Sequence, residues 1–223
     1  ILKIKVAQTS KGGLAKFEIG NHSYEILPAY QDAASRTYLW DLRFGIPKKI
    51  DLCSEIYIPD ILGHFPVGKE HLHAVDNLQI RTSENSLLED LYLRVSQSGS
   101  PTAPILNLGE TTSYLWNPLE VTWEVNGYSG NKSKTHVYQR SANGARSFVG
   151  GDWVQNQIRF KTRNFGSFVL AEDATKPSIS PIRVNSQGMR FTIKDNLSGI
   201  NSFEAFVYGE LVWLRYEHKQ AVI

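Results

Sequence analysis

The chain has 223 residues, of which 41% are hydrophobic, 11% aromatic and 21% charged, a composition typical of a folded globular protein and unlike that of disordered or membrane proteins. Its 24 basic and 22 acidic residues are spread along the sequence and leave a net charge of +2, so we expect no nucleic-acid partner. No stretch reaches the roughly 18 to 20 consecutive apolar residues of a membrane-spanning helix, so we expect no transmembrane segment.

Short runs of alternating apolar and polar residues recur along the chain between clusters of Gly, Pro, Asn and Ser, and this pattern predicts strands and turns. The clearest runs are 2–6, 14–19, 55–58, 78–81, 121–125, 136–139, 157–161, 167–171, 189–193 and 206–216. Their spacing of about a dozen residues is typical of sandwiches. We therefore predict an all-β fold made of tandem immunoglobulin-like β-sandwich modules.

Residues 1–20 contain two strand-like runs joined by Gly12-Gly13, a pair that suits a tight turn. We interpret this segment as the closing hairpin of an upstream module. Residues 21–173 are then expected to form a β-sandwich region, either one sandwich or two halves. The strongest loop signal in the chain, Ser-Gly-Ser-Pro-Thr-Ala-Pro at 98–104, places a break between such halves.

A further boundary is expected where Pro177 and Pro181 stiffen an extended linker after Asp173. Residues 174–223 would be a separately packed C-terminal immunoglobulin-like module. Because about 45 residues are few for such a sandwich, we expect this module to be truncated. Within it, Asp195 and Gly199 belong to a run that predicts a turn in which the carboxylate binds nearby backbone and the glycine takes a positive φ.

The single cysteine, Cys53, lies among apolar residues and cannot form an internal disulfide. We expect a buried, reduced thiol.

Trp116 and Trp153 are the two candidate ligand-binding residues, because flat aromatic faces stack on sugar rings and both side chains follow turn-like sequence. Core packing or loop anchoring is the alternative for each. Trp123, by contrast, shares one face of an alternating run with Val121 and Val125 and is expected in the core.

Catalytic motifs are missing from the sequence: it has neither a Gly-x-Ser-x-Gly elbow nor a phosphate loop of the Walker type. We expect no catalytic residues, no cofactor and no enzymatic activity of this chain.

Five phrases, in this order, resemble the region downstream of the catalytic domain in Gram-negative lysostaphin/LytM-type zinc endopeptidases, which cut peptidoglycan cross-links. The phrases are YLWDLR at 38–43, NSLLEDLYL at 85–93, FVGGDW at 148–153, KTRNFGSF at 161–168 and DNLSGI at 195–200. The resemblance covers nearly the whole chain.

This resemblance implies a periplasmic or extracellular location at the cell envelope and a secreted bacterial protein. It implies that the chain is a non-catalytic accessory region that positions or anchors a peptidoglycan metallopeptidase, with the upstream catalytic domain or cell-wall glycan or peptide as partner. The alternative is a stand-alone cell-surface adhesion or glycan-binding protein. A Gly-x-x-x-His-x-Gly-x-Asp stretch and a later His-x-His upstream of Ile1 would favour the first reading.

His71 and His73 form a His-x-His that resembles half of the metal signature of this family. A catalytic zinc needs three protein ligands and an open position for water. The upstream His22 and His64 are not followed by Gly and Asp at the family's spacing. We therefore expect a surface histidine pair and no bound metal.

Overall fold

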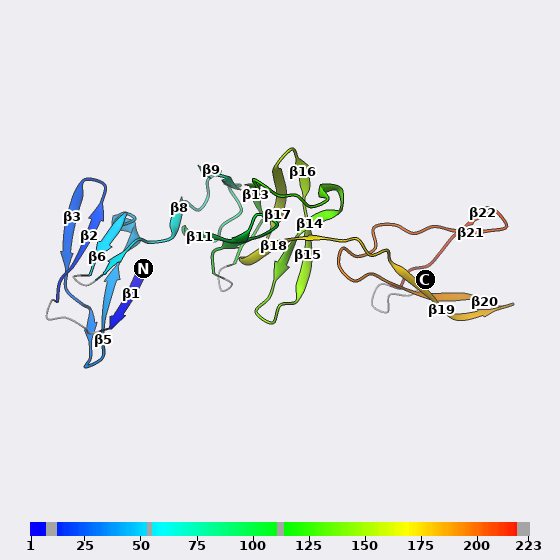
Figure 1. Cartoon of the computed structure of the whole chain (residues 1–223), viewed down its shortest axis with the longest axis horizontal. Helices are drawn as coiled ribbons and strands as arrows, with labels where there is room; N and C mark the ends of the chain where they lie inside the picture. Colours follow the sequence, from blue (N-terminus) through cyan, green and yellow to red (C-terminus); the bar gives the residue numbers. More distant parts are fainter. Residues whose placement is uncertain (8–12, 53–54, 111–113, 218–223) are drawn as a thin grey trace.

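The computed structural model describes residues 1–7, 13–52, 55–110 and 114–217, and it confirms the all-β prediction (Figure 1). Of these described residues, 57% lie in strands and 3% in helices. The strands are antiparallel and make three successive groups along the chain, an N-terminal segment, a central sandwich and a C-terminal segment. Cys53 lies outside the described residues, so its predicted burial stays a prediction. Nowhere in the described part of the chain is a helix long and apolar enough to cross a membrane.

The N-terminal segment consists of two small sheets that face each other across one apolar core. One sheet has the order β1-β5-β4 and the other β3-β2-β6-β7. The strands are β1 (Leu2–Ala7), β2 (Ala15–Ile19), β3 (His22–Ile26), β4 (Tyr30–Gln31), β5 (Ser35–Trp40), β6 (Lys49–Asp51) and β7 (Ile56–Tyr57). A short 3-10 helix, η1 (Leu42–Phe44), follows β5.

Alternation along these strands decides which side chains enter the core. Leu2 and Ile4 are buried while Lys3 and Lys5 between them are exposed, because successive side chains of a strand point to opposite faces. The core is formed by Leu2, Ile4, Ala15, Phe17, Tyr38, Trp40, Leu42, Ile50 and Leu52.

The predicted hairpin of residues 1–20 is wrong in its pairing. β1 pairs with β5 over six residue pairs, whereas β2 pairs with β3 and β6 in the opposite sheet. The two runs therefore belong to different sheets of one module, and residues 1–20 are part of it together with the segment that follows. The physical reason is that β1 buries its apolar face against β2 across the core. The alternating pattern of β1 and β2 is compatible both with this arrangement and with a hairpin.

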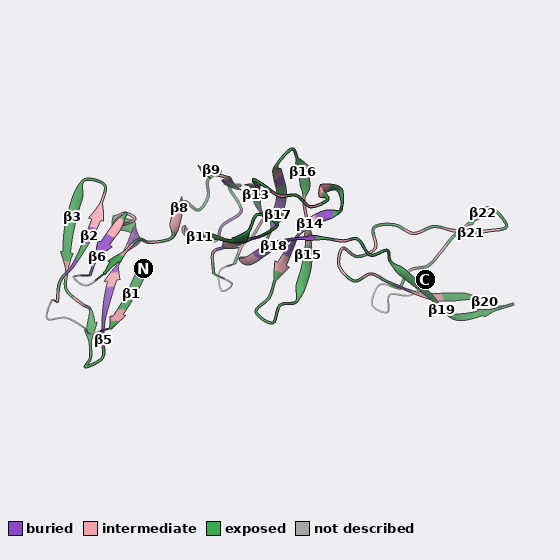
Figure 2. Ribbon diagram, in the orientation of Figure 1, coloured by how far each residue is buried: buried purple, intermediate pink, exposed green. Residues whose placement is uncertain are grey.

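The central sandwich packs a six-stranded sheet, in the order β15-β14-β18-β12-β11-β8, on a five-stranded sheet, in the order β16-β17-β13-β10-β9. Its strands are β8 (Ile61–Phe65), β9 (His71–Val75), β10 (Leu78–Thr82), β11 (Leu91–Ser100), β12 (Ala103–Leu108), β13 (Leu119–Glu124), β14 (Thr135–Arg140), β15 (Arg146–Gly150), β16 (Asp152–Val154), β17 (Gln157–Thr162) and β18 (Gly166–Glu172). A second 3-10 helix is η2 (Lys132–Lys134). Trp123 is 1% exposed in the core between the sheets, as predicted, and Figure 2 shows the buried residues concentrated there.

The predicted break at 98–104 is a hairpin turn inside this sandwich. β11 and β12 pair in register from Val95↔Leu108 to Ser100↔Ala103. The Gly, Ser and Pro residues that predict a loop thus supply the turn between two strands of one sheet, and the sandwich continues on both sides of it.

The C-terminal segment is thinly packed. It consists of two hairpins, β19 (Ser178–Asn185) with β20 (Gly188–Lys194), and β21 (Ala205–Val207) with β22 (Glu210–Val212). Between them the predicted Asp195 turn is confirmed: Asp195 Oδ2 accepts hydrogen bonds from the backbone N–H groups of Leu197 and Gly199, both at 2.9 Å, and Gly199 has φ +84°. Whether residues 174–223 are a separate, truncated module stays a prediction.

Neighbouring segments touch at two places. Ile61 and Tyr92, on the outer side of β8 and β11, pack against the N-terminal core. At the other end Asp173 Oδ2 accepts hydrogen bonds from the backbone N–H of Ser198 at 3.0 Å and from its hydroxyl at 2.5 Å. These bonds lower the pKa of Asp173, with the hydroxyl bond the largest cause. The three segments are therefore joined by side-chain contacts as well as by the chain itself.

Candidate functional site

Three charged residues lie in one row across the outer face of the five-stranded sheet. Arg81 on β10 is directly opposite Glu120 on β13, and Glu120 is directly opposite Lys161 on β17. The row arises because each strand alternates buried and outward-facing residues and all three residues occupy outward positions in register. Cross-strand neighbours on one face are close enough for their side chains to interact.

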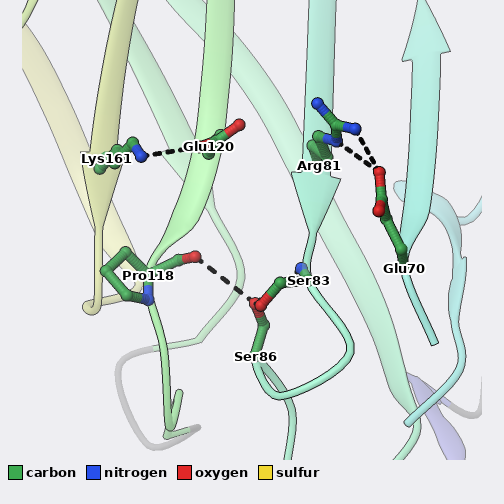
Figure 3. Close-up of polar contacts among 7 residues, drawn as sticks. All are labelled: Glu70, Arg81, Ser83, Ser86, Pro118, Glu120 and Lys161. Atoms are coloured by element: carbon green, nitrogen blue, oxygen red, sulfur yellow. Dashed lines mark hydrogen bonds and ion pairs between the residues drawn. The ribbon is translucent and has the colours of Figure 1, made fainter. Parts of the chain in front are cut away.

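Ion pairs extend and order this row, as Figure 3 shows. Lys161 Nζ lies 2.7 Å from Glu120 Oε1, and Arg81 donates to Glu70, just before β9, from its Nε at 2.8 Å and also from Nη2. The result is an alternation of negative and positive groups over neighbouring strands, hereafter the charged row, made of Glu70, Arg81, Glu120 and Lys161. The hydrogen bond from Lys161 is the main cause that lowers the pKa of Glu120, and both cations add to it.

The charged row borders a shallow hollow of about 330 Å³ at one end of the sandwich. Its lining residues include two with hydroxyl groups, one with an amide and the four charged residues, whose aliphatic parts line it together with a proline. The lining residues are Glu70, Arg81, Thr82, Ser83, Asn117, Pro118, Glu120 and Lys161.

The end wall of the hollow is held by a buried serine. Ser86 is 0% exposed, and its hydroxyl accepts from the backbone N–H of Ser83 at 2.9 Å and donates to the carbonyl of Pro118 at 3.5 Å (Figure 3). These bonds tie the loop after β10 to the loop before β13. The hollow therefore lies at the ends of two strands, and its wall is a loop that is held in place by these hydrogen bonds.

Trp116 immediately precedes the lining residue Asn117 and is 67% exposed. Its backbone N–H donates to the carbonyl of Ser86 at 2.9 Å, so the backbone of the exposed tryptophan is anchored on the same loop as the wall of the hollow. Tyr114, two residues earlier, is 79% exposed. The sequence-predicted candidate Trp116 is thus next in the chain to a residue that lines the hollow, and its side chain is exposed.

Trp153 is placed differently. Its indole Nε1 donates to the carbonyl of Thr135 at 2.8 Å, its ring stacks on Tyr128 at 5.5 Å, and the Lys132 ammonium lies 5.3 Å from the ring centroid. The side chain packs against the central core and serves as a loop anchor. A ligand at Trp153 stays a prediction.

His71 and His73 do share one face of β9, as predicted, but they are half-buried rather than a surface pair. Both rings contact the buried Phe65, at 5.2 and 5.8 Å between centroids, and lie 6.3 Å from each other. The two histidines are half-buried because β9 is an edge strand and its inner face covers the end of the core. Over residues 1–7, 13–52, 55–110 and 114–217, no group of three or more His, Cys, Asp or Glu side chains is placed to hold a metal ion.

A larger hollow of about 700 Å³ lies at the β14–β15 hairpin and carries little chemistry. Its lining has one charged side chain and no aromatic ring, namely Gln139, Arg140, Ser141, Ala142, Gly144, Ser147, Gly166 and Ser167. The smaller hollow combines opposite charges, hydroxyls and an amide with a neighbouring exposed tryptophan, and is the better candidate for recognition.

Sequence comparison with known families gives one match: residues 63–173 match the Zu5-like domain family. The matched stretch runs from within β8 to the residue after β18, which is the central sandwich and includes the entire charged row. No curated protein matches the chain. The match supports the description of the central sandwich as one domain, and it does not test the resemblance to the endopeptidase region.

Proposed function

We propose that this chain is a non-catalytic glycan-binding region and that it binds through the hollow beside Trp116. The observation that carries the proposal is an exposed tryptophan next in the chain to Asn117, which lines a hollow that holds opposite charges at one end of the sandwich. A sugar ring has an apolar C–H face and a rim of hydroxyls. An aromatic ring can cover the face, while charged side chains form the stronger class of hydrogen bond with the hydroxyls.

The charged row suits hydroxyl recognition because it offers donors and acceptors side by side. Arg81 and Lys161 can donate, and the carboxylates of Glu70 and Glu120 can accept. Neighbouring hydroxyls of one sugar act as donor and acceptor in turn. The two cations and two carboxylates balance, so the row favours a polyhydroxyl ligand over a strongly anionic polymer.

The resemblance to the region downstream of LytM-type endopeptidases supports a narrower form of this proposal. In that form the glycan belongs to peptidoglycan, the location is the periplasm or cell surface, and the chain anchors a metallopeptidase on its substrate. The alternative of a stand-alone glycan-binding or adhesion protein shares the same site and differs in the protein to which the sandwich is attached.

Co-sedimentation with purified peptidoglycan, chitin and cellulose tests the proposal. We expect the chain to sediment with peptidoglycan and to leave the turbidity of a cell-wall suspension unchanged, in its natural form and as His71→Ala. Clearing of the suspension that His71→Ala abolishes would overturn the non-catalytic part. Absence of the chain from all three pellets would overturn the glycan-binding part.

A further inference from the structure

A second hollow lies on the five-stranded sheet and shares a wall with the hollow that Asn117 lines, hereafter the first hollow. The second hollow has a volume of about 350 Å³, and Thr122, Asp152 and Arg159 are among the residues that line it. Glu120 and Lys161, the ion pair drawn in Figure 3, line both hollows. The two hollows are therefore neighbours on one surface, separated by a single ion pair.

The two hollows follow each other along β13. Asn117, just before this strand, lines the first hollow, Glu120 lines both, and Thr122 lines the second. Glu120 and Thr122 are two residues apart on one strand, so they share its outer face and lie roughly 7 Å from each other. Arg159 on β17 is directly opposite Thr122, and Asp152 on β16 is directly opposite Arg159. A second polar row thus runs parallel to the charged row.

Asp152 and Arg159 provide polar groups that the rest of the protein leaves available. Both residues are exposed and directly opposite each other, yet among the described residues neither side chain has a hydrogen bond or an ion pair. Glu120, by contrast, is already paired with Lys161 at 2.7 Å. A carboxylate and a guanidinium that line the same hollow can accept from and donate to the hydroxyls of one sugar.

Two glycines place Asp152 beside Arg159. Gly150 ends β15 in the six-stranded sheet, and β16 begins two residues later in the five-stranded sheet. The chain crosses between the sheets with φ +93° at Gly150 and +123° at Gly151, values that residues with a side chain rarely adopt. A Cβ atom on Gly151 would also lie 3.2 Å from the carbonyl oxygen of Arg159. The Gly-Gly-Asp sequence therefore positions one wall of the second hollow.

We propose that the ligand is an extended glycan chain that lies along β13 and fills both hollows. Its first sugars occupy the first hollow, the following sugars cross the shared ion pair, and the last ones reach Asp152 and Arg159. This inference rests on the proposed glycan site and specifies its ligand as a tetrasaccharide or a longer chain rather than a single sugar.

Charge and covalent linkage both favour such a ligand. A strongly anionic polymer would bring its charges against Glu120 and Asp152, which both line the second hollow. A wholly apolar ligand would leave the charged groups without hydrogen-bonding partners. Sugars joined in one chain enter the second hollow without a second full loss of translational freedom, so filling both hollows strengthens binding steeply.

Isothermal titration calorimetry with peptidoglycan glycan fragments of increasing length tests the proposal. We expect the full chain to bind the tetrasaccharide at least about tenfold more tightly than the disaccharide. The double variant D152N/R159Q should reduce this gain to about twofold or less, because it removes the charged groups of the second hollow. The control E172Q/R146Q makes the same change of charge on the six-stranded sheet and should keep the full gain. Circular dichroism of each variant checks that the sandwich remains folded.

Failure of this inference is distinguishable from failure of the glycan site. Equal affinities for all fragments, together with loss of binding in Trp116→Ala, would overturn the extended ligand and leave the site in place. A tetrasaccharide gain that D152N/R159Q retains would assign the additional sugars to another surface and would also overturn the inference. Binding of two disaccharides per protein chain, without a gain for the tetrasaccharide, would show two separate sites instead of one. Absence of binding for every fragment would overturn both proposals.

Discussion

The five tryptophans show how the surroundings of a side chain decide its role. Trp40 and Trp123 are buried, Trp153 is half-buried with its indole N–H bonded to backbone, and Trp116 and Trp213 are exposed. The sequence identifies Trp123 correctly because alternation with Val121 and Val125 needs only local information. It does not separate Trp116 from Trp153, since both follow turns and the partner of Trp153 is a carbonyl 18 residues away in the chain.

Trp123 and Trp213 provide a matched pair for testing the core. Trp123→Ala should lower the free energy of unfolding by about 3 to 5 kcal/mol, because it leaves a cavity between the sheets and removes the donor to Gln97. Trp213→Ala removes the same kind of side chain at a position that is 96% exposed. It should change the free energy of unfolding by about 0.5 kcal/mol or less. Urea unfolding followed by far-ultraviolet circular dichroism measures both. Equal effects of the two changes would contradict the assigned core.

At the scale of the element, the strands were predictable and their partners were not. Period-two alternation identifies a strand and its buried face, yet it carries no information about which strand lies beside it. For this reason β1 was expected in a hairpin with β2 but pairs with β5. Turn residues are equally ambiguous, because they do not distinguish a linker between domains from a turn within one sheet. The segment 98–104 has the composition of a linker and forms a hairpin turn.

The charged row illustrates this limit at the candidate site. Arg81 and Lys161 end two of the predicted strand-like runs, and Glu120 comes just before a third, the run 121–125; all three occupy outward positions of the observed strands. Their alignment depends on the register of two strand pairings, which the sequence does not supply. The sequence feature that could have indicated the charged row is the presence of outward-facing charged residues on separate predicted strands.

Gly99 tests the β11–β12 turn. It has φ +88°, and a Cβ atom there would lie 2.2 Å from the carbonyl oxygen of Ala103. Gly144 has a similar φ of +86° with open space around the same position. Gly144→Ala should therefore lower the free energy of unfolding by about 1 to 2 kcal/mol, the backbone cost alone, and Gly99→Ala by clearly more. Chemical denaturation of both variants checks the difference, and an equal loss would argue against the close approach in this turn.

At the scale of the whole molecule, separate cores are joined by few contacts. Tyr92 projects from β11 into contact with the N-terminal core, and the His64 ring stacks on it with the centroids 4.7 Å apart. His64 in turn pairs with Asp90 at 3.0 Å. Such a junction can be weakened without unfolding either side, because the apolar core of the central sandwich consists of other residues.

Tyr92→Ala should loosen the N-terminal segment from the central sandwich. We expect limited proteolysis to cut between residues 52 and 60 at least about tenfold faster, while the central sandwich survives as a resistant fragment. Tyr114→Ala, at a position that is 79% exposed, is the control and should leave the rate unchanged. Rapid digestion of the sandwich in Tyr92→Ala would show that Tyr92 supports the fold itself.

Glycan binding at the hollow beside Trp116 is measured by the dissociation constant for soluble peptidoglycan glycan fragments. By isothermal titration calorimetry we expect Trp116→Ala to weaken binding at least about tenfold, equivalent to about 1.4 kcal/mol, while Trp116→Phe retains most of it and Trp213→Ala all of it. Unchanged affinity in Trp116→Ala, or loss of affinity in Trp213→Ala alone, would contradict the site.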